Sequence, residues 1–491
     1  MKKIYQLLLL LSVIIISAAS CKKILEPKIY SQVNSDDFPK SEADVKSGLI
    51  PFYAQFNPTY GSTDISNGQY DFSLTASFLG YTWATSTQTD ENFDIYYFPY
   101  SQFTLGPSTA LNTSGEAFYS RVSYIAKLTV LIDKVEKSNI NQKALYIAEA
   151  KGLRAWFMYV LYDLYGPVSV KLDPATVASL DVTARPGKEV YAAAVEADLL
   201  AAIAGLPNKY NGTNDWGRLS KGAARMILLK LYMHDKKWDK AKTVGTDLMG
   251  MGYTLNPSYK DVFVTSQNSE VIFAVPGSNA TESIWFACLL PEDAQSVLGN
   301  DVSLGEKYKL VGMPWGFYDK YTAGDSRLET IANSYINNSG QTISRATGLD
   351  LAIPMKYTKY VINGFGFDYV IYRYSDVVLS MAEITNELAG PTAEAQGYLK
   401  QVTDRAKTTA SIPAGTFASA AAMRSFILEE RGRELYWEFG IRRQDLIRNG
   451  TFISNAITRG ITEAKPHKVL WPIPADVIIQ SGGIITQNAG Y

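Results

Sequence analysis

The chain has 491 residues, and its 47 basic and 48 acidic side chains leave a formal net charge of −1. A chain of this length can form about three domains of ordinary size or one large domain with insertions. Its near-neutral charge gives no field that would hold nucleic acid, so nucleic-acid binding is not expected. Because the whole chain holds only two His and two Cys, we expect no zinc site and no disulfide framework. No cofactor is predicted.

The first twenty residues have the layout of a signal peptide. Two lysines precede an apolar run, Leu7–Ala19, and small residues then lead into Cys21. The run is 13 residues long, whereas a helix that spans a bilayer needs about 20 residues. We therefore predict that residues 1–20 are removed as a signal peptide.

Cys21 directly follows this cleavage site, an arrangement that resembles the bacterial lipoprotein box. In that motif the cysteine thiol and the new amino terminus are both acylated. Several acyl chains give stable membrane attachment, whereas a single chain gives only marginal binding. Cys21 is therefore the predicted lipid anchor, and ordinary secretion with an incidental cysteine is the alternative.

The segment from residue 57 to residue 115 has the most unusual composition in the chain. It holds twelve aromatic and five acidic residues in 59 positions, and it contains no Lys or Arg. Gly, Pro, Ser, Thr and Asn are frequent, which predicts loops and short strands. The aromatic content argues against disorder, so we expect an ordered, irregular insertion.

Helical patterns follow between residues 142 and 250. In Gln142–Tyr165, apolar or small residues recur every three to four positions, and Gly166-Pro167 ends the pattern. Ser220 can cap a second helix, which turns at Asp235-Lys236-Lys237 into another helix ending near Gly250. This second pattern predicts a helical hairpin of about tetratricopeptide length.

A second irregular block, from about residue 252 to residue 330, interrupts the helices. It contains Trp285 and Trp315 together with short strand-like runs such as Val271–Val275. Another helical pair then runs from Tyr374 through a break at Gly390-Pro391, and a further helix is predicted from Met423 to Phe439. Hairpins scattered along the chain imply a superhelical stack, because each hairpin buries only one face against its neighbours.

No motif for covalent chemistry or phosphate binding is found in the chain. The carboxylates of Asp90, Glu91 and Asp94 could in principle hydrolyse glycosides as a pair, although one sequence does not give their separation in space. The charged run Glu429–Glu434 has helical spacing, which predicts a solvated helix face. An interlocked buried network is the alternative for that run.

Three tryptophans are the best candidates for ligand contact. Trp83, Trp285 and Trp315 fall in the irregular segments, where a flat ring with one polar edge can stack on a ligand. A pyranose suits such a site, since it has C–H-rich faces and a hydroxyl rim. Packing in the core is the alternative for each ring.

Polar neighbours of Trp83 would complete such a site. Tyr81, Asp90 and Asn92 lie close to it in sequence and would contact the hydroxyl rim of a sugar. Together with the three tryptophans, they form the predicted ligand-binding set. No catalytic residue is assigned.

Several motifs resemble the SusD/RagB family, and in combination they are specific to it. They span nearly the whole chain and are, beside Cys21, Arg154–Phe157, Tyr162–Val168, Tyr372–Leu379, Glu429–Arg431, Glu438–Arg443, Pro472–Pro474 and Gln487–Tyr491. Members of this family are outer-membrane lipoproteins that bind nutrients, usually glycans. They cap a TonB-dependent transporter barrel and are not enzymes.

The resemblance implies a mainly α fold, a tetratricopeptide-like superhelix whose irregular loops and short strands form the ligand face. Residues 21–491 would form one domain, with the frame at about 115–250 and 370–450 and the insertions at about 57–115 and 252–330. The frame helices would face the transporter barrel. Trp83 falls in a segment where family members often place a stacking aromatic residue.

We therefore predict a monomeric lipoprotein at the cell outer membrane, facing the exterior, that binds a neutral oligosaccharide and delivers it to a SusC-like TonB-dependent transporter without making or breaking bonds. Residence in the inner leaflet is the alternative orientation, because Lys22-Lys23 after Cys21 depart from the acid-rich export signal common in this family. Three alternatives remain open. They are a glycoside hydrolase on a helical scaffold, a peptide-binding member of the same family, and a helical-repeat adaptor that binds only proteins.

Overall fold

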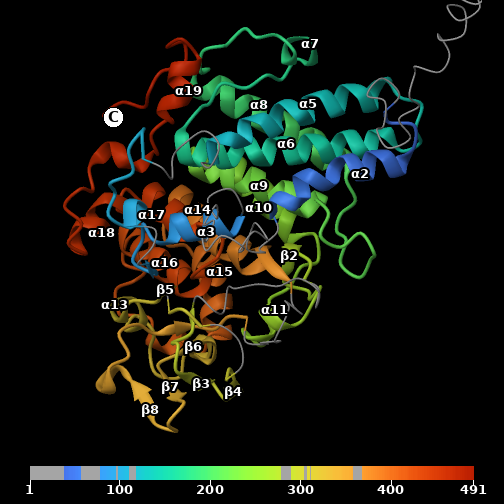
Figure 1. Ribbon diagram of the computed structural model, residues 1–491. Helices are drawn as coiled ribbons and strands as arrows, with labels where there is room; N and C mark the ends of the chain where they lie inside the picture. Colours follow the sequence, from blue (N-terminus) through green and yellow to red (C-terminus); the bar gives the residue numbers. More distant parts are fainter. Residues whose placement is uncertain are drawn as a thin grey trace, which may run out of the picture.

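The computed structural model describes residues 38–56, 78–94, 98–109, 118–277, 289–303, 307–309, 311–357 and 368–491. These residues are mainly helical, and most of the short strands lie in the lower part of the molecule in Figure 1, which confirms the predicted fold class. The predicted signal peptide and Cys21 lie outside the described residues. No helix in the described part of the chain is long and apolar enough to cross a membrane.

The first half of the helical frame consists of helices that pack in order along the chain. Its longer helices are α2 (Glu42–Tyr53), α5 (Val122–Lys137), α6 (Lys143–Tyr165), α8 (Lys188–Gly205), α9 (Lys221–His234) and α10 (Trp238–Met249). The predicted cap at Ser220 is present, because its Oγ accepts a hydrogen bond from the Ala223 amide at 3.2 Å. Helix α6 ends at Gly166, as predicted.

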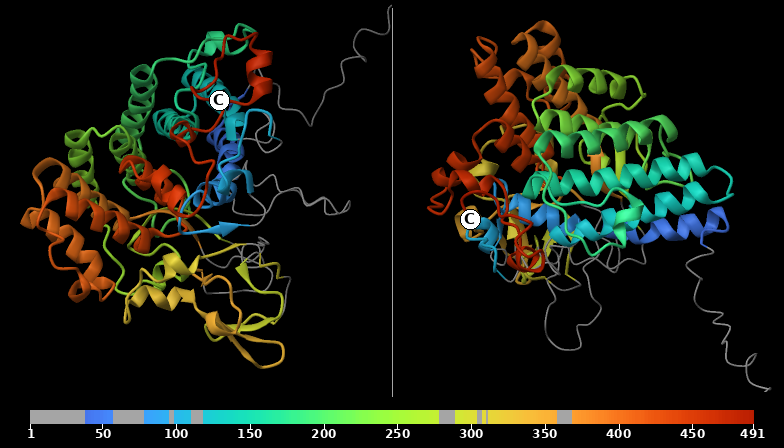
Figure 2. Two further views of the ribbon diagram at one scale, coloured as in Figure 1. Left: turned by 90° about the vertical axis from the view of Figure 1, so that its left-hand side faces the viewer. Right: turned by 90° about the horizontal axis from the view of Figure 1, so that it is seen from above.

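The frame continues after the second insertion. Its helices there are α14 (Tyr374–Ala389), α15 (Ala393–Arg405), α16 (Ala420–Leu435), α17 (Ile441–Arg448) and α18 (Phe452–Thr458). Helix α14 packs on α10 as well as on α15 and α16, so the two halves form one stack. In the left view of Figure 2 the helices follow one another around an arc. The predicted superhelix of hairpins is therefore confirmed.

One helix ends earlier than predicted. The pattern over Met423–Phe439 predicted a single helix, but α16 stops at Leu435. Trp437 and Phe439 have positive φ angles, and Gly440 follows at φ +66°. A Cβ on Gly440 would lie only 2.8 Å from Tyr81 Cε1, so this turn brings α3 (Phe78–Ser86) very close. The apolar periodicity does not report this turn or its contact with α3.

The strands form small antiparallel sheets. A four-stranded sheet has the order β4-β3-β7-β8, and the described residues also form the pairs β1-β5, β2-β10 and β6-β9. The strands are β1 (Phe93–Asp94), β2 (Val271–Val275), β3 (Ala294–Val297), β4 (Asn300–Asp301), β5 (Val311–Gly312), β6 (Ile331–Ala332), β7 (Ser334–Asn337), β8 (Thr342–Ser344), β9 (Ile353–Pro354) and β10 (Tyr369–Arg373). The strand predicted at Val271–Val275 is confirmed as β2.

The pairing of β1 with β5 joins the first irregular segment to the second. Shorter helices complete the described structure, namely α4 (Phe98–Ser101), α7 (Pro174–Val177), α11 (Asp261–Val264), α13 (Trp315–Tyr318) and α19 (Ala475–Gln480). The strand-rich part with α13 lies below the helical frame in Figure 1.

The expectation of loops and short strands across residues 57–115 is wrong for Phe78–Ser86, which form helix α3. Tyr81, Trp83 and Ala84 of this helix belong to the main hydrophobic core. The prediction of loops rested partly on the frequent Ser and Thr residues of this segment. In α3 their hydroxyls are satisfied by the helix itself, as when Thr85 Oγ1 donates to the Tyr81 carbonyl at 2.5 Å.

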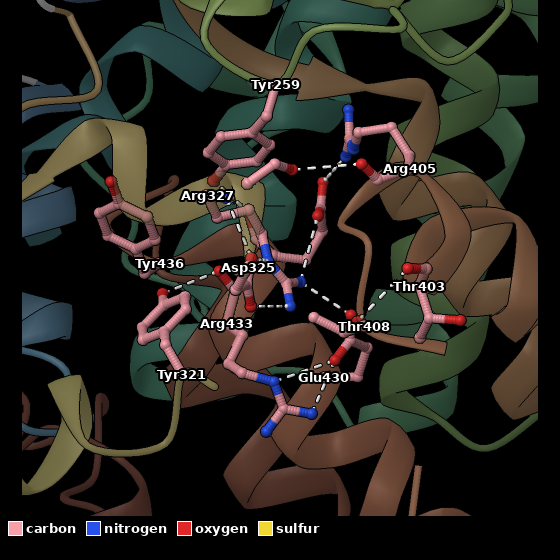
Figure 3. A network of polar contacts seen from close by, with 12 residues as sticks. Tyr259, Tyr321, Asp325, Arg327, Thr403, Arg405, Thr408, Glu430, Arg433 and Tyr436 are labelled. Atoms are coloured by element: carbon pink, nitrogen blue, oxygen red, sulfur yellow. Dashed lines mark hydrogen bonds and ion pairs between the residues drawn. The ribbon is translucent and has the colours of Figure 1, made fainter. Parts of the chain in front are cut away.

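The charged run Glu429–Glu434 is largely buried, which corrects the expectation of a solvated helix face. Glu430, Arg431 and Glu434 of α16 are each at most 1% exposed. The guanidinium of Arg327 lies between two carboxylates, since it contacts Glu430 at 2.7 Å and Asp325 at 2.8 Å (Figure 3). The charges pair with partners far away in sequence, which spacing along one helix does not reveal.

This buried ion-pair network is balanced in charge. Ion pairs connect five basic residues, Arg327, Lys356, Arg373, Arg405 and Arg433, with five acidic residues, Glu270, Asp325, Glu430, Glu434 and Glu438. The network joins α16 to Glu270, the residue before β2, to the last residues of β10 and α15, and to the short helix η7 (Ser326–Thr330), which carries Arg327. It therefore ties the strand-rich part of the molecule to the helical frame.

Candidate functional site

Two of the residues predicted to bind ligand lie inside the core. The Trp83 side chain is 1% exposed and Tyr81 is fully buried. The Tyr81 hydroxyl donates to Asp163 at 3.0 Å and accepts from Gln444 at 3.1 Å, so it links α3 to α6 and α17. In this structure neither ring presents a face to solvent, because α3 is a buried helix and not an open loop.

Asn92 and Asp90 are also engaged within the protein. Asn92 is buried and donates from Nδ2 to Ser86 Oγ at 3.0 Å. Asp90 forms ion pairs with Arg442 at 2.8 Å and with Lys320 at 2.7 Å. Although burial alone would raise the pKa of Asp90, these two cations hold it well below its usual range.

Asp90 thereby positions a neighbouring helix. Lys320 lies two residues after α13, and it also contacts Glu429 of α16 at 2.5 Å. Through Lys320 and Arg442, Asp90 connects the segment after α3 with both α13 and α17. The first aromatic segment thus contributes to the support of α13.

Trp315, on α13, is the predicted tryptophan that the structure places at the surface, and Trp285 lies outside the described residues. The Trp315 ring is partly buried against the core. Its Nε1 donates to the Leu349 carbonyl at 3.0 Å, which fixes the orientation of the ring. Tyr318 packs edge-on to it, with 5.3 Å between the ring centroids.

Polar groups surround these two rings. The guanidinium of Arg345 lies 5.0 Å from the Trp315 ring centroid and also pairs with Asp319 at 3.0 Å. The Tyr318 hydroxyl accepts a hydrogen bond from Asn333 Nδ2 at 3.1 Å. That bond leaves the hydroxyl proton of Tyr318 able to donate to a ligand.

We name Trp315, Tyr318, Asp319, Asn333 and Arg345 the Trp315 shelf. Because Arg345 and Asp319 neutralise each other, the shelf offers aromatic surface, hydroxyl and amide groups without net charge. Such a surface fits an uncharged ligand with one apolar face and a polar rim.

Tyr318, Asn333 and Arg345 are not among the residues predicted from the sequence to bind ligand. The three-residue spacing of Trp315 and Tyr318 was a usable signal, since residues at i and i+3 of a helical turn share one face. Asn333 and Arg345 come from the strand-rich segment after α13, and they reach Tyr318 and Trp315 only because that segment folds back. No local sequence pattern predicts this contact.

The structure does not present the carboxylates considered for glycoside hydrolysis as an accessible pair. Asp90 is held by two cations. Glu91 is 1% exposed, and its Oε2 has no hydrogen-bond partner among the described residues. No group of three or more His, Cys, Asp or Glu side chains in the described ranges is arranged to hold a metal ion.

Glu91 gives a pH-dependent stability prediction. Burial raises its pKa to about 8, against the attraction of Arg442. The folded protein therefore keeps a proton on Glu91 that the unfolded chain releases above a pH of about 4.3, so this group lowers stability as the pH rises from there towards 8. We expect Glu91→Gln to be more stable than the wild type at pH 8, by a few kcal/mol, and close to it at pH 4.

Chemical denaturation of both proteins at pH 4, 6 and 8 measures this difference. Exposed Glu329 provides the matched control, and Glu329→Gln should follow the wild type at every pH. A constant difference between Glu91→Gln and the wild type across the three pH values would show that Glu91 does not titrate as described.

With the geometry of the shelf established, comparison with known proteins identifies relatives. A family model described as the SusD family matches residues 354–491. The SusD-like protein P25 of Formosa agariphila is 23% identical, and the alignment covers 94% of each chain. The resemblance inferred from the motifs is therefore confirmed.

Solved structures extend this similarity to the whole fold. A laminarin binding SusD-like protein superposes with a TM-score of 0.74 at 20% identity, covering 92% of this chain and 100% of that one. Surface glycan-binding protein A from Bacteroides thetaiotaomicron in complex with laminarihexaose gives a TM-score of 0.70 at 17% identity, covering 91% and 100%. At these identities the match establishes the fold.

Proposed function

We propose that this chain, a SusD-like protein by its motifs and its fold, binds a neutral oligosaccharide and delivers it to a TonB-dependent transporter of the outer membrane. Two solved structures of the same fold carry glycans in their names, laminarin in one and laminarihexaose in the other. That similarity supports glycans as the ligand class.

The observation that carries the proposal is the Trp315 shelf. An oriented tryptophan and a tyrosine stand beside an amide and a neutralised ion pair at the surface. A charged ligand would gain nothing from groups that already neutralise each other, whereas a pyranose can stack on the rings and bond to the polar edge. The proposed ligand-binding set therefore centres on Trp315 and Tyr318.

The remaining predicted residues have different proposed roles in ligand binding. Asp90 supports α13 through its ion pair with Lys320, whereas Tyr81 and Trp83 belong to the core and Asn92 bonds to Ser86. Direct contact of these residues with a ligand would require the segment from Tyr81 to Asn92 to rearrange. Trp285 keeps its proposed role as a ligand contact, although it lies outside the described residues.

The proposal involves binding without bond cleavage. The burial of Glu91 and the ion pairs of Asp90 support it, since glycoside hydrolysis needs two carboxyl groups that flank the bound sugar. Attachment to the outer membrane through Cys21 rests on the sequence motif. Labelled palmitate should enter the wild type but not Cys21→Ala, and equal labelling of the two would remove the anchor from the proposal.

Titration calorimetry against a panel of neutral hexasaccharides tests the ligand class. The panel contains laminarihexaose, cellohexaose, maltohexaose, xylohexaose and mannohexaose, with a mixed peptide pool as comparison. We expect saturable heat with at least one saccharide and no shorter product after prolonged incubation. Product formation would favour the hydrolase, and heat with the peptides alone would favour the peptide-binding alternative.

Isolation from the native envelope tests the transporter. A tagged chain extracted in mild detergent should bring down a TonB-dependent barrel in about equal amount. Recovery of the chain by itself, with saccharide binding intact, would limit the function to glycan capture.

A further inference from the structure

A second aromatic cavity lies away from the Trp315 shelf. Its volume is about 220 Å³, and it opens between the end of α2 with the short helix η2 (Ala54–Phe56), the turn before α9, and β2. Its walls include Tyr53, Phe56, Trp216, Phe273 and Pro276. In Figure 1, α2 and β2 lie on the right of the molecule and α13 on the left, so the two places are separate.

The Trp216 wall is held in a fixed orientation. The indole Nε1 donates to Asp368 Oδ2 at 2.8 Å, and the same carboxylate accepts from Ser266 Oγ at 2.7 Å. Next to it, Gly217 has φ +92°, and a Cβ there would lie 2.4 Å from Pro276 Cγ. Only glycine allows Pro276 this close approach, so the two walls meet in a defined geometry before any ligand arrives.

The floor of this cavity is apolar and its edge is polar. Phe56 and Phe273 are buried and pack edge to face, with 5.4 Å between their centroids. At the edge, Arg218 donates from Nε to Glu149 at 2.9 Å and from Nη1 to Asp215 at 2.9 Å. Its Nη2 also contacts Glu149.

These contacts at the edge indicate which ligand charge the cavity favours. These three hydrogen bonds use three of the five N–H groups of Arg218, and the other two can donate to a hydroxyl. Two carboxylates already offset the guanidinium charge, so an anion finds no excess positive charge here. A neutral group that carries hydroxyls suits the edge better.

The volume decides the size of the ligand. An apolar cavity of roughly 150 Å³ holds one benzene ring. A cavity of about 220 Å³ therefore accommodates one six-membered ring with its substituents, and it is too small for a chain of rings.

From size, charge and wall chemistry together, we propose that this cavity, the Trp216 pocket, binds a single neutral pyranose, the terminal ring of a glycan. The inference rests on the proposed function, because it assumes that glycans are the ligands. It adds a site for a chain end that is separate from the Trp315 shelf, so recognition depends on the end of the saccharide as well as on its length.

Two variants test the pocket by opposite means. Trp216→Ala removes a wall, whereas Val275→Phe adds a ring to a residue that lines the cavity and leaves the wall in place. Trp238→Ala is the matched control, since Trp238 is also a partly buried tryptophan but lies on α10 outside the pocket. Thermal unfolding confirms that each variant is folded.

Each protein is titrated with the hexasaccharide that binds the wild type best, and saturation-transfer NMR reports which of its rings contacts the protein. We expect both pocket variants to raise Kd about tenfold and to lose the signal of one terminal ring, while Trp238→Ala behaves like the wild type. If both pocket variants bind like the wild type while Trp315→Ala weakens binding, the pocket assignment fails and the proposed function stands. If the wild type binds no saccharide of the panel, both fail, and Trp216-dependent binding of a Gly-Phe-Gly tripeptide would assign the pocket to an aromatic side chain.

Discussion

Glu434→Gln is expected to lower the free energy of unfolding by about 3–5 kcal/mol, because it removes one partner from a buried charge network. Glu434 has no exposed side-chain surface and contacts Arg373 at 2.6 Å, Arg327 at 3.4 Å and also Arg405. In the wild type five acidic groups balance five basic groups. The substitution keeps the shape of the side chain and leaves one buried positive charge without compensation.

The pH dependence follows from the same contacts. Burial alone would raise the pKa of Glu434, but Arg405, Arg373 and Arg327 hold it well below its usual range. A carboxyl group with a lowered folded-state pKa contributes stability that is complete above its unfolded pKa of about 4.3 and is lost as the pH falls further. The gap between the wild type and Glu434→Gln should therefore be full at pH 7 and should narrow below pH 4.

Urea denaturation at pH 7 and at pH 3.5 measures both statements. Glu394→Gln is the matched control, since Glu394 pairs with Lys242 at 3.2 Å on the surface. An exposed pair contributes only about 0–1 kcal/mol, so this variant should stay near the wild type. If both variants lost the same free energy of unfolding, burial of the network would not add to its contribution to stability.

Trp315→Ala is expected to weaken saccharide binding by at least about tenfold, equivalent to about 1.4 kcal/mol, because stacking aromatics dominate the energy of such sites. The ring is partly buried and its Nε1 bond to Leu349 mainly sets its orientation. The loss in unfolding free energy should therefore be smaller than that of Glu434→Gln. Calorimetry with the best-binding hexasaccharide measures the affinity.

Two further variants separate stacking from orientation. Trp315→Phe keeps an aromatic ring but loses the Nε1–H donor, so it should retain part of the affinity. Trp238→Ala, outside the shelf, should bind like the wild type. Unchanged affinity in Trp315→Ala would exclude the shelf as the binding surface and leave Trp285 as the remaining predicted tryptophan contact.

The candidate site shows what the composition of a segment can predict about its ligand-binding residues. It placed Trp315, which is partly exposed, in the same category as Trp83 and Tyr81, which are both buried. All three lie in segments rich in aromatic and small polar residues. Composition describes a segment as a whole, whereas exposure depends on which neighbours cover each side chain.

The amino-acid sequence by itself determined the helical frame, because helix periodicity and capping are interactions between residues at most a few positions apart. The cap at Ser220 and the stop at Gly166 are of this kind. Only the tertiary structure decided the burial of Trp83, the charge network and the Trp315 shelf. Arg327 pairs with Glu430 across 103 positions and Asp90 with Arg442 across 352, and contacts over such separations form only when the whole chain has folded around them.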